Sequence, residues 1–403
     1  MALTTAVQAD HTSPSKPVAS RLIAEHGLIG DLQTAALVAM DGTIDWYCCP
    51  RFDSPSVFAR LLDHQRGGFF RIAPENESYV VKQLYFPDTA VLITRFMSEA
   101  GVAELTDFMP IADNPKMATD RHRIVRLVRG VRGSMRLKVQ CAPRFDYARA
   151  RHALEVTEHG AVFAAPDLRL TLHGAAGLEH HGGDVHMSRV VRANETFGLM
   201  LDSAADTPPR ALLDEELWRL FEGTTGFWRR WVAASAYRGR WREMVDRSAM
   251  ALKLMTYAPT GALVAAPTAG LPEQPGGERN WDYRFTWVRD ASYSVGALLA
   301  LGYTEEPYAF LTWLRERIEE HVGTSSGPLK IMYRVDGSSD LVEETLDHLE
   351  GYQGSRPVRI GNGAADQLQL DIYGEAMFAL RQAGGTRAPI GDRGWKDIRH
   401  IID

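Results

Sequence analysis

The sequence predicts a multidomain protein in which an antiparallel β-sandwich is followed by a mostly helical region. Between Leu22 and about Leu201, short segments rich in Val, Ile, Thr and Phe alternate with turn residues, which is typical of paired strands. From Arg210 onward, apolar residues recur at helical spacing instead. A length of 403 residues suits roughly two or three domains. We therefore predict a tail over residues 1–20, a β-sandwich domain over 21–205, a helical linker over 206–240 and a helical domain over 241–403.

The overall composition is that of an ordinary globular protein, with 45% hydrophobic and 24% charged residues. A net charge of −6 does not favour a nucleic-acid partner. Three cysteines, two of them adjacent at Cys48 and Cys49, form no disulfide framework and fit a reducing compartment. Residues 1–20 lack a signal-peptide pattern and predict a disordered tail, and no apolar run is long enough to span a bilayer. We expect a cytoplasmic protein without a membrane partner.

Pairs of β-type segments separated by short turns predict hairpins in the first half of the chain. Segments 37–40 and 43–47 flank Asp41-Gly42, a dipeptide that suits a tight turn. Many antiparallel strands with few helices favour a β-sandwich. The same pattern predicts hairpins from 89–96 with 102–108, from 123–128 with 134–140, and from 161–164 with 168–172, and segment 190–201 closes the series.

The linker over 206–240 combines helical spacing with large aromatic rings. We expect the tryptophans of this segment to pack between the two domains rather than to form a binding platform, because large apolar rings are mostly buried. They are Trp218, Trp228 and Trp231.

The region after the linker carries several helical patterns. Segment 241–255 places Trp241 and Met244 on one apolar face, and segment 291–301 is apolar nearly all round, which predicts a buried helix. Further helices are expected at 304–321, 364–382 and 395–402, with a small hairpin from 329–333 around Gly337.

The segment Asn280-Trp-Asp-Tyr-Arg-Phe-Thr-Trp-Val-Arg-Asp290 is the strongest candidate for a binding site. Aromatic faces can cover the C–H face of a pyranose, and arginine and carboxylate groups fix its hydroxyls. The same residues also suit a buried cluster that only ties loops together, because charged groups beside aromatic rings need partners in either case. The residues alone leave both interpretations open.

Several blocks, in order along the chain, resemble glycoside hydrolase family 15, the bacterial glucoamylase and trehalase-like group. Ile29-Gly-Asp-Leu-Gln-Thr-Ala-Ala-Leu37 and Pro50-Arg-Phe-Asp-Ser-Pro55 resemble its trehalase-like N-terminal domain. In the second half, the 280–290 segment is followed by Gly354-Ser-Arg-Pro-Val-Arg-Ile-Gly-Asn362 and Gln369-Leu-Asp-Ile-Tyr-Gly-Glu375. The resemblance implies a β-sandwich followed by part of an α/α toroid of the six-hairpin glycosidase type. It also implies exo-acting, inverting hydrolysis of α-glucosidic bonds that releases glucose from trehalose or another glucose-containing oligosaccharide.

The resemblance also implies positions for the substrate-binding residues. Arg289 and Asp290 match the pair that holds the terminal glucose, and Trp281 and Trp287 look like walls of that pocket. An arginine fork and a carboxylate can bind several vicinal hydroxyls of one sugar ring, which agrees with this assignment. The loop that frames the entrance is matched by Arg356 and Arg359.

Asp371 and Glu375 are possible supporting residues. They lie four positions apart on one predicted helix face, with Cβ atoms only ~5–6 Å apart. Two carboxylates on one helix face are poorly placed to act as an acid and a base on opposite sides of a sugar ring. We therefore interpret Asp371 and Glu375 as hydrogen-bonding residues that position their neighbours. An acid/base pair is the alternative.

The resemblance leaves the catalytic carboxylates unassigned. The general acid of the family lies in a Trp-Glu motif and the base further along the chain, but no Trp-Glu occurs in this sequence. An inverting glycosidase needs both groups, ~6.5–9.5 Å apart. We therefore expect the catalytic residues to lie beyond Asp403, with this chain corresponding to a C-terminally truncated family member. The alternatives are an inactive product that only binds carbohydrate or acts as a scaffold, and assembly with a second polypeptide.

We expect neither a cofactor nor a metal ion. No phosphate-binding loop of the Gly-x-x-x-x-Gly-Lys type occurs. The histidines between His173 and His186 could bind a metal, but their Gly-rich spacing favours an exposed loop. The sequence does not separate trehalose from maltooligosaccharides or isomaltose, and it predicts no oligomeric state.

Overall fold

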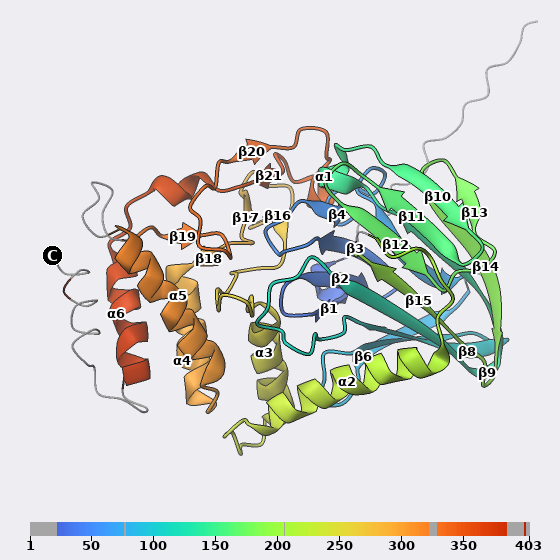
Figure 1. Cartoon of the computed structure of the whole chain (residues 1–403), viewed down its shortest axis with the longest axis horizontal. Coiled ribbons are helices and arrows are strands. Elements are labelled where there is room, and N and C mark those ends of the chain that lie inside the picture. Colours follow the sequence, from blue (N-terminus) through green and yellow to red (C-terminus); the bar gives the residue numbers. More distant parts are fainter. Residues whose placement is uncertain (1–21, 76–77, 205, 322–328, 385–398, 400–403) are drawn as a thin grey trace, which may run out of the picture.

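The computed structural model describes residues 22–384, apart from 76–77, 205 and 322–328, together with residue 399. Within this part of the chain, a mostly β N-terminal region precedes a region with helices, as predicted (Figure 1). The predicted tail over 1–20 and nearly all of the predicted helix over 395–402 lie outside the described residues.

The strands of the first region form one antiparallel network of 15 strands among the described residues. Its main path runs β1-β2-β3-β5-β9-β15-β12-β11-β10. The strands are β1 (His26–Gly30), β2 (Ala35–Ala39), β3 (Thr43–Cys48), β4 (Ser56–Phe58), β5 (Phe69–Pro74), β6 (Val80–Tyr85), β7 (Leu92–Met97), β8 (Gly101–Phe108), β9 (Arg123–Ala142), β10 (Ala153–Thr157), β11 (Gly160–Ala164), β12 (Arg169–His173), β13 (Glu179–His181), β14 (Asp184–Arg192) and β15 (Thr196–Asp202). Three predicted hairpins are confirmed, β2 with β3, β7 with β8 and β11 with β12.

The long strand β9 joins the two halves of this network. Its first part pairs with β8 and β15, and its second part pairs with β5 and β14. The predicted hairpin between 128 and 134 is therefore wrong. A Cβ atom on Gly130 would lie 2.0 Å from the carbonyl oxygen of Arg192, so this glycine marks a close approach of two backbones rather than a turn. The real turn lies at Asn194, with φ +67°, and divides the predicted single segment 190–201 into β14 and β15.

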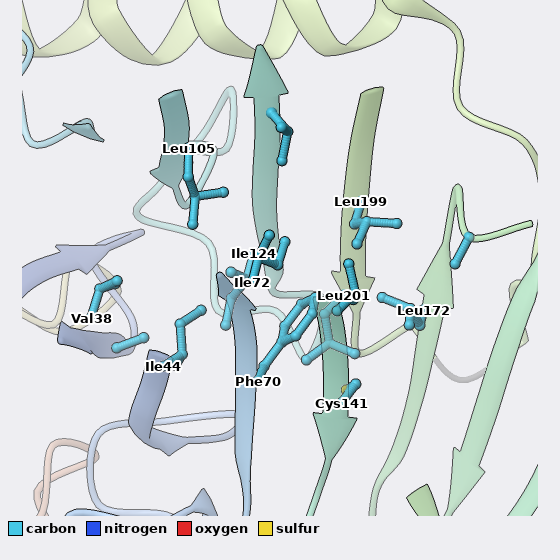
Figure 2. Close-up of a cluster of buried hydrophobic side chains, with 14 of the residues drawn as sticks. Val38, Ile44, Phe70, Ile72, Leu105, Ile124, Cys141, Leu172, Leu199 and Leu201 are labelled. Atoms are coloured by element: carbon cyan, nitrogen blue, oxygen red, sulfur yellow. The ribbon is translucent and has the colours of Figure 1, made fainter. Parts of the chain in front are cut away.

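A continuous cluster of apolar side chains fills the space enclosed by these strands. Figure 2 shows Val38, Phe70 and Leu199 converging from β2, β5 and β15. Each fully buried side chain of this kind contributes about 1.5–3 kcal/mol relative to an exposed one. Beside the cluster lies a completely buried ion pair, in which Arg126 Nε donates to Asp107 Oδ1 at 2.8 Å.

The helices are α1 (Phe145–Ala148), α2 (Asp214–Ala233), α3 (Arg242–Leu254), α4 (Val288–Ala300), α5 (Glu305–His321) and α6 (Asp371–Gly384). The linker helix α2 contacts both neighbours. Its Phe221 ring lies 5.4 Å from the ring of Phe86, and its Trp228 is fully buried in a cluster that includes Met250 of α3. The predicted packing of a linker tryptophan between the β region and the following helices is thus confirmed for Trp228, whereas Trp218 is 41% exposed.

The apolar face predicted for α3 is the exposed face, because the opposite side of the helix packs against Trp228. Trp241 is 55% and Met244 is 67% exposed, whereas Met250 is 2% exposed. Trp241 and Met244 line an open depression of about 500 Å³ between α3 and α4. The predicted burial of α4 on all sides is also wrong, since Tyr293 is 60% exposed.

Two further predictions are corrected near the end of the described chain. The helix predicted from 364 begins only at Asp371, because Gly363–Asp366 forms a separate 3-10 turn and Gln367 is extended with ψ 146°. The predicted hairpin around Gly337 does not form either. Its strand β19 (Met332–Tyr333) pairs instead with β18 (Thr286–Trp287). The other short strands are β16 (Ala269–Pro272), β17 (Asn280–Asp282), β20 (Glu344–Thr345) and β21 (Arg359–Ile360).

Replacing Met244 by glutamate should reduce self-association of the purified chain, because it puts a charge on an exposed apolar face. Size-exclusion chromatography with light scattering measures this. The matched control on the same helix is Met250→Glu, which would bury an unpaired charge and should cost roughly 3–5 kcal/mol of stability. Equal aggregation of the Met244→Glu variant and the wild type would contradict this account of the exposed face.

An ion pair between the two regions gives a prediction for acid stability. Asp336 accepts a hydrogen bond at 2.7 Å from Arg51, which follows β3. Burial opposes ionisation of this carboxyl, but hydrogen bonds from Ser338 and Arg51 outweigh it and lower the pKa of Asp336 to about 2. Because the pKa in the unfolded chain is higher, about 3.9, this group stabilises the fold above about pH 4, and the stabilisation is lost as the pH falls toward 2.

Replacing Asp336 by asparagine should therefore lower the melting temperature at neutral pH, and the difference from the wild type should shrink below about pH 4. Thermal denaturation measured over a series of pH values tests this. The exposed Asp340 on the same loop provides a control, since Asp340→Asn should leave the pH dependence unchanged. A difference between wild type and Asp336→Asn that stays constant from neutral pH to about pH 2 would contradict the assignment.

Candidate functional site

The 280–290 segment divides into a buried half and an exposed half. Asp282 and Arg284 have side chains that are 0% and 1% exposed. Arg289 and Asp290, in the first turn of α4, have side chains that are 38% and 49% exposed. The buried-cluster interpretation of the sequence is therefore correct for the first half only. The second half presents charged groups to solvent.

In the buried half, the Arg284 guanidinium makes hydrogen bonds in two directions. Nε and Nη2 donate to the two carboxylate oxygens of Asp282 at 2.9 and 2.6 Å. Nη1 donates to the carbonyl oxygen of Ser54 at 2.6 Å, and Nη2 donates to the hydroxyl of Tyr147 at 2.7 Å. Burial disfavours the charge, but the adjacent Asp282 carboxylate more than offsets it and raises the pKa of Arg284. This group joins the segment to the β region.

In the exposed half, Arg289 is held by Asp371, the first residue of α6, and by Gln369 just before it. Its Nη1 atom donates to Asp371 Oδ2 at 2.8 Å and to Gln369 Oε1 at 3.4 Å. This hydrogen bond raises the pKa of Arg289 and lowers that of Asp371. The Arg289 guanidinium carbon lies 5.9 Å from the ring centre of Trp287. The cation thus lies beside an aromatic ring and an ionised carboxylate.

Glu375, one turn further along α6, is also engaged by α4. The hydroxyl of Tyr293 donates to Glu375 Oε1 at 3.0 Å, and this hydrogen bond raises the pKa of Tyr293. Asp371 and Glu375 therefore each accept a hydrogen bond from a different α4 side chain. Tyr293 lies four positions after Arg289 on the same helix, so helical spacing could have identified it from the sequence.

A second group brings Trp281 and Arg359 together. The Arg359 guanidinium carbon lies 4.6 Å from the ring centre of Trp281. Its Nη1 atom donates to the carbonyl oxygen of Glu278 at 2.7 Å, and its Nε atom lies 3.2 Å from Glu343 Oε1. The guanidinium is thus fixed between an aromatic ring and two acceptors. Sequence reasoning missed Glu343, which directly precedes β20 and lies 16 positions before Arg359, because no local pattern links the two residues.

Tyr283 lies beside the first group. Its ring centre lies 5.9 Å from that of Trp287, and the two planes are inclined by 48°. Burial raises the pKa of the Tyr283 hydroxyl, and the carboxylates of Glu273 and Asp290 raise it further. Arg356 is exposed, and its Nε atom donates to the carbonyl oxygen of Glu350 at 3.4 Å. No hydrogen bond, ion pair or ring contact within the described part of the chain joins it to the two groups above.

This arrangement offers an uncharged polyhydroxy ligand aromatic faces, the two arginines Arg289 and Arg359, and several carboxylates. The indole Nε1 of Trp287 is a buried donor with no hydrogen-bond partner among the described residues. Within the same part of the chain, no group of three His, Cys, Asp or Glu residues is placed to hold a metal ion. None of the helices described is long and apolar enough to cross a membrane.

Comparison with protein families places two matches on the chain. Residues 239–402 match the family Glycosyl hydrolases family 15, and residues 18–193 match the family Trehalase-like, N-terminal. The first match contains all of the candidate site residues, and the second covers most of the β region.

Curated relatives resemble the chain over most of its length. It is 39% identical over 365 residues to a trehalase of Thermoplasma volcanium, with 89% of this chain and 57% of the relative covered. It is 34% identical over 410 residues to a trehalase of Mycolicibacterium smegmatis, with 94% and 60% covered. The chain therefore spans 57% and 60% of the lengths of these two relatives.

A solved structure gives a more distant likeness. It is described as "Putative kojibiose phosphorylase from human microbiome" and superimposes with a TM-score of 0.50 at 7% sequence identity. The likeness covers 93% of this chain and 56% of that chain. At this identity the comparison concerns the fold alone.

Proposed function

We propose that this chain, which resembles glycosyl hydrolase family 15 over residues 239–402 and trehalases over most of its length, functions in the hydrolysis of the α-glucosidic bond of trehalose. The names of the relatives support trehalose over maltooligosaccharides and isomaltose. The cysteine content supports a cytoplasmic location. The proposal includes no cofactor.

The proposed fold follows the same resemblance. The β region over 21–205 is a β-sandwich domain, the 206–240 segment is a linker, and the helices from 241 are part of an α/α toroid. The division of β9 between two sets of partner strands supports the first assignment. The contacts of α4 with both α5 and α6 are compatible with the last.

The proposed sugar site is centred on Arg289, and its contact with Asp371 is the observation that carries the proposal. Asp371 holds the guanidinium beside the Trp287 ring. Among the described residues, Nη2 and Nε of Arg289 have no hydrogen-bond partner, although Nε lies 4.0 Å from Asp290 Oδ2, and these two donors would bind vicinal hydroxyls of a terminal glucose. Asp290 would accept hydrogen bonds from the same sugar, and Trp287 would cover its C–H face. Trp281 and Arg359 would form the neighbouring wall, with Arg356 at the entrance.

The proposed reaction is an inverting hydrolysis that releases glucose. Water attacks the anomeric carbon as the glycosidic C–O bond breaks, a general base takes a proton from the water, and a general acid protonates the departing oxygen. Asp371 and Glu375 lie on one side of one helix and accept hydrogen bonds from Arg289 and Tyr293. We propose that these two carboxylates position those side chains. The proposal assigns the roles of acid and base to neither.

Binding of carbohydrate without hydrolysis is the second candidate function. Two observations favour it. The sequence contains no Trp-Glu dipeptide, and the α6 carboxylates nearest to Arg289 and Tyr293 already accept hydrogen bonds from these residues. In this case the chain would bind a glucose unit, or serve as a scaffold, and leave the bond intact.

Replacing Arg289 by alanine should weaken trehalose binding about 10- to 100-fold, because hydrogen bonds to a charged group contribute about 1.5–3 kcal/mol. Isothermal titration calorimetry measures the affinity, and an enzymatic glucose assay measures hydrolysis of trehalose and maltose by the same samples. The control is Arg381→Ala, an exposed arginine in the last turn of α6.

The outcomes separate the candidates. Binding with glucose release supports hydrolysis, and binding without glucose release supports the second candidate. Equal affinities of the Arg289→Ala and Arg381→Ala variants would remove Arg289 from the site. A wild-type chain that neither binds nor cleaves trehalose or maltose would contradict both functions.

A further inference from the structure

The loop that carries Arg359 packs on the β region through Val358, which shares a buried apolar cluster with Trp46 and Leu62. Beyond Val358, the loop is held by hydrogen bonds to one buried residue. Arg359 begins the short strand β21, and Gly361 and Asn362 follow it. The backbone N–H of Gly361 donates to Asp282 Oδ2 at 3.2 Å, and the Asn362 side-chain amide donates to the Asp282 carbonyl oxygen at 3.1 Å. Asp282 therefore fixes this loop by both its side chain and its backbone.

The conformation of the loop leaves little room for an alternative. Gly361 has φ +68°, and a Cβ atom at this position would lie 1.9 Å from the carbonyl oxygen of Val342. The chain must turn here in a conformation that favours glycine. The Gly361 N–H points at a fully buried carboxylate, so the Asp282 oxygen that accepts it must stay in place for the turn to persist.

Asp282 is in turn held by Arg284, whose other partners belong to the β region. Both Asp282 oxygens accept from the Arg284 guanidinium, which also reaches the Ser54 carbonyl oxygen and the Tyr147 hydroxyl. Ser54 and Tyr147 are buried, with 8% and 3% exposure. The contacts thus run without interruption from the β region through Arg284 and Asp282 to the loop that carries Arg359.

We infer that Arg284 is a positioning residue for the sugar site, and that through it the β region determines where the 356–362 loop and the Arg359 side chain lie. The Arg284 side chain is only 1% exposed, so its role would be exerted through Asp282 rather than by contact with a sugar. This inference rests on the proposed sugar-binding function of Arg359 and Trp281. The inference also extends the proposed function, because it makes the β region a structural part of the sugar site rather than a neighbouring domain.

Lysine cannot reproduce the geometry of Arg284, because an ammonium group lacks the planar fork that reaches Asp282, Ser54 and Tyr147 together. The Arg284→Lys variant keeps the charge and most of the volume. We expect it to increase amide hydrogen exchange in the 356–362 loop and to weaken trehalose binding on the order of 10- to 100-fold, as a misplaced binding group does. Tyr147→Phe removes one partner of Arg284 only and should give a smaller change of the same kind.

A matched control is Arg126, which among the described residues is likewise fully buried and has a bidentate aspartate partner. Arg126 lies within the β network, where it also donates to the carbonyl oxygens of Phe70 and Gly42. Arg126→Lys should lower the melting temperature to a similar extent. It should leave the exchange of the 356–362 loop and the affinity for trehalose unchanged.

The experiment combines hydrogen exchange followed by mass spectrometry with calorimetric titration of trehalose, on full-length variants well below their melting temperatures. Faster loop exchange in Arg284→Lys than in Arg126→Lys supports the inference. Equal exchange of the loop in these two variants would overturn it, whatever their stabilities. If the wild type binds no trehalose, the proposed function fails, and the exchange measurement alone still decides whether Arg284 positions the loop.

Discussion

The contact between Arg284 and Asp282 is the interaction on which the arrangement of the candidate site depends. A buried charge is tolerated only when its partner and hydrogen bonds compensate for the loss of water, and loss of one partner costs about 3–5 kcal/mol. Arg284 meets this condition with groups from two parts of the chain, Asp282 beside it and Ser54 and Tyr147 in the β region. The β region and the 280–290 segment therefore cannot separate at this point without leaving an unpaired charge in the interior.

The exposed half of the same segment follows from this anchor. The helix α4 begins four residues after Arg284. A fixed position of Arg284 therefore also fixes the first turn of α4, from which the Arg289 side chain extends. Asp371 of α6 then sets the direction of the guanidinium. On the other side, Asp282 fixes the turn at Gly361 and with it the strand that carries Arg359. One buried pair thus sets the position of two arginines that come from distant parts of the sequence.

Local patterns in the sequence predicted the order of β and helical regions and most of the hairpins, because turn residues act on their immediate neighbours. The predictions failed where the structure of a segment depends on a residue that is distant in the sequence. Gly130 was predicted to lie in a turn, but it is a glycine because the backbone carbonyl of Arg192 lies against it. The apolar spacing within α3 predicted that its Trp241 and Met244 face is buried. The face that is buried is the one covered by Trp228, and Trp228 belongs to α2, so the spacing within α3 could not show it. The partners of Arg284 are 230 and 137 positions away, so no local pattern could distinguish its buried role from the exposed role of Arg289.

A crystal structure of the full-length chain with trehalose would test the central claim most directly. The account predicts one glucose unit against the face of Trp287, with its hydroxyls within hydrogen-bond distance of Arg289 and Asp290, and with the Arg284 and Asp282 side chains in the same contacts as in the free chain. Trehalose bound elsewhere, with Arg289 in contact only with Asp371 and Gln369, would contradict it.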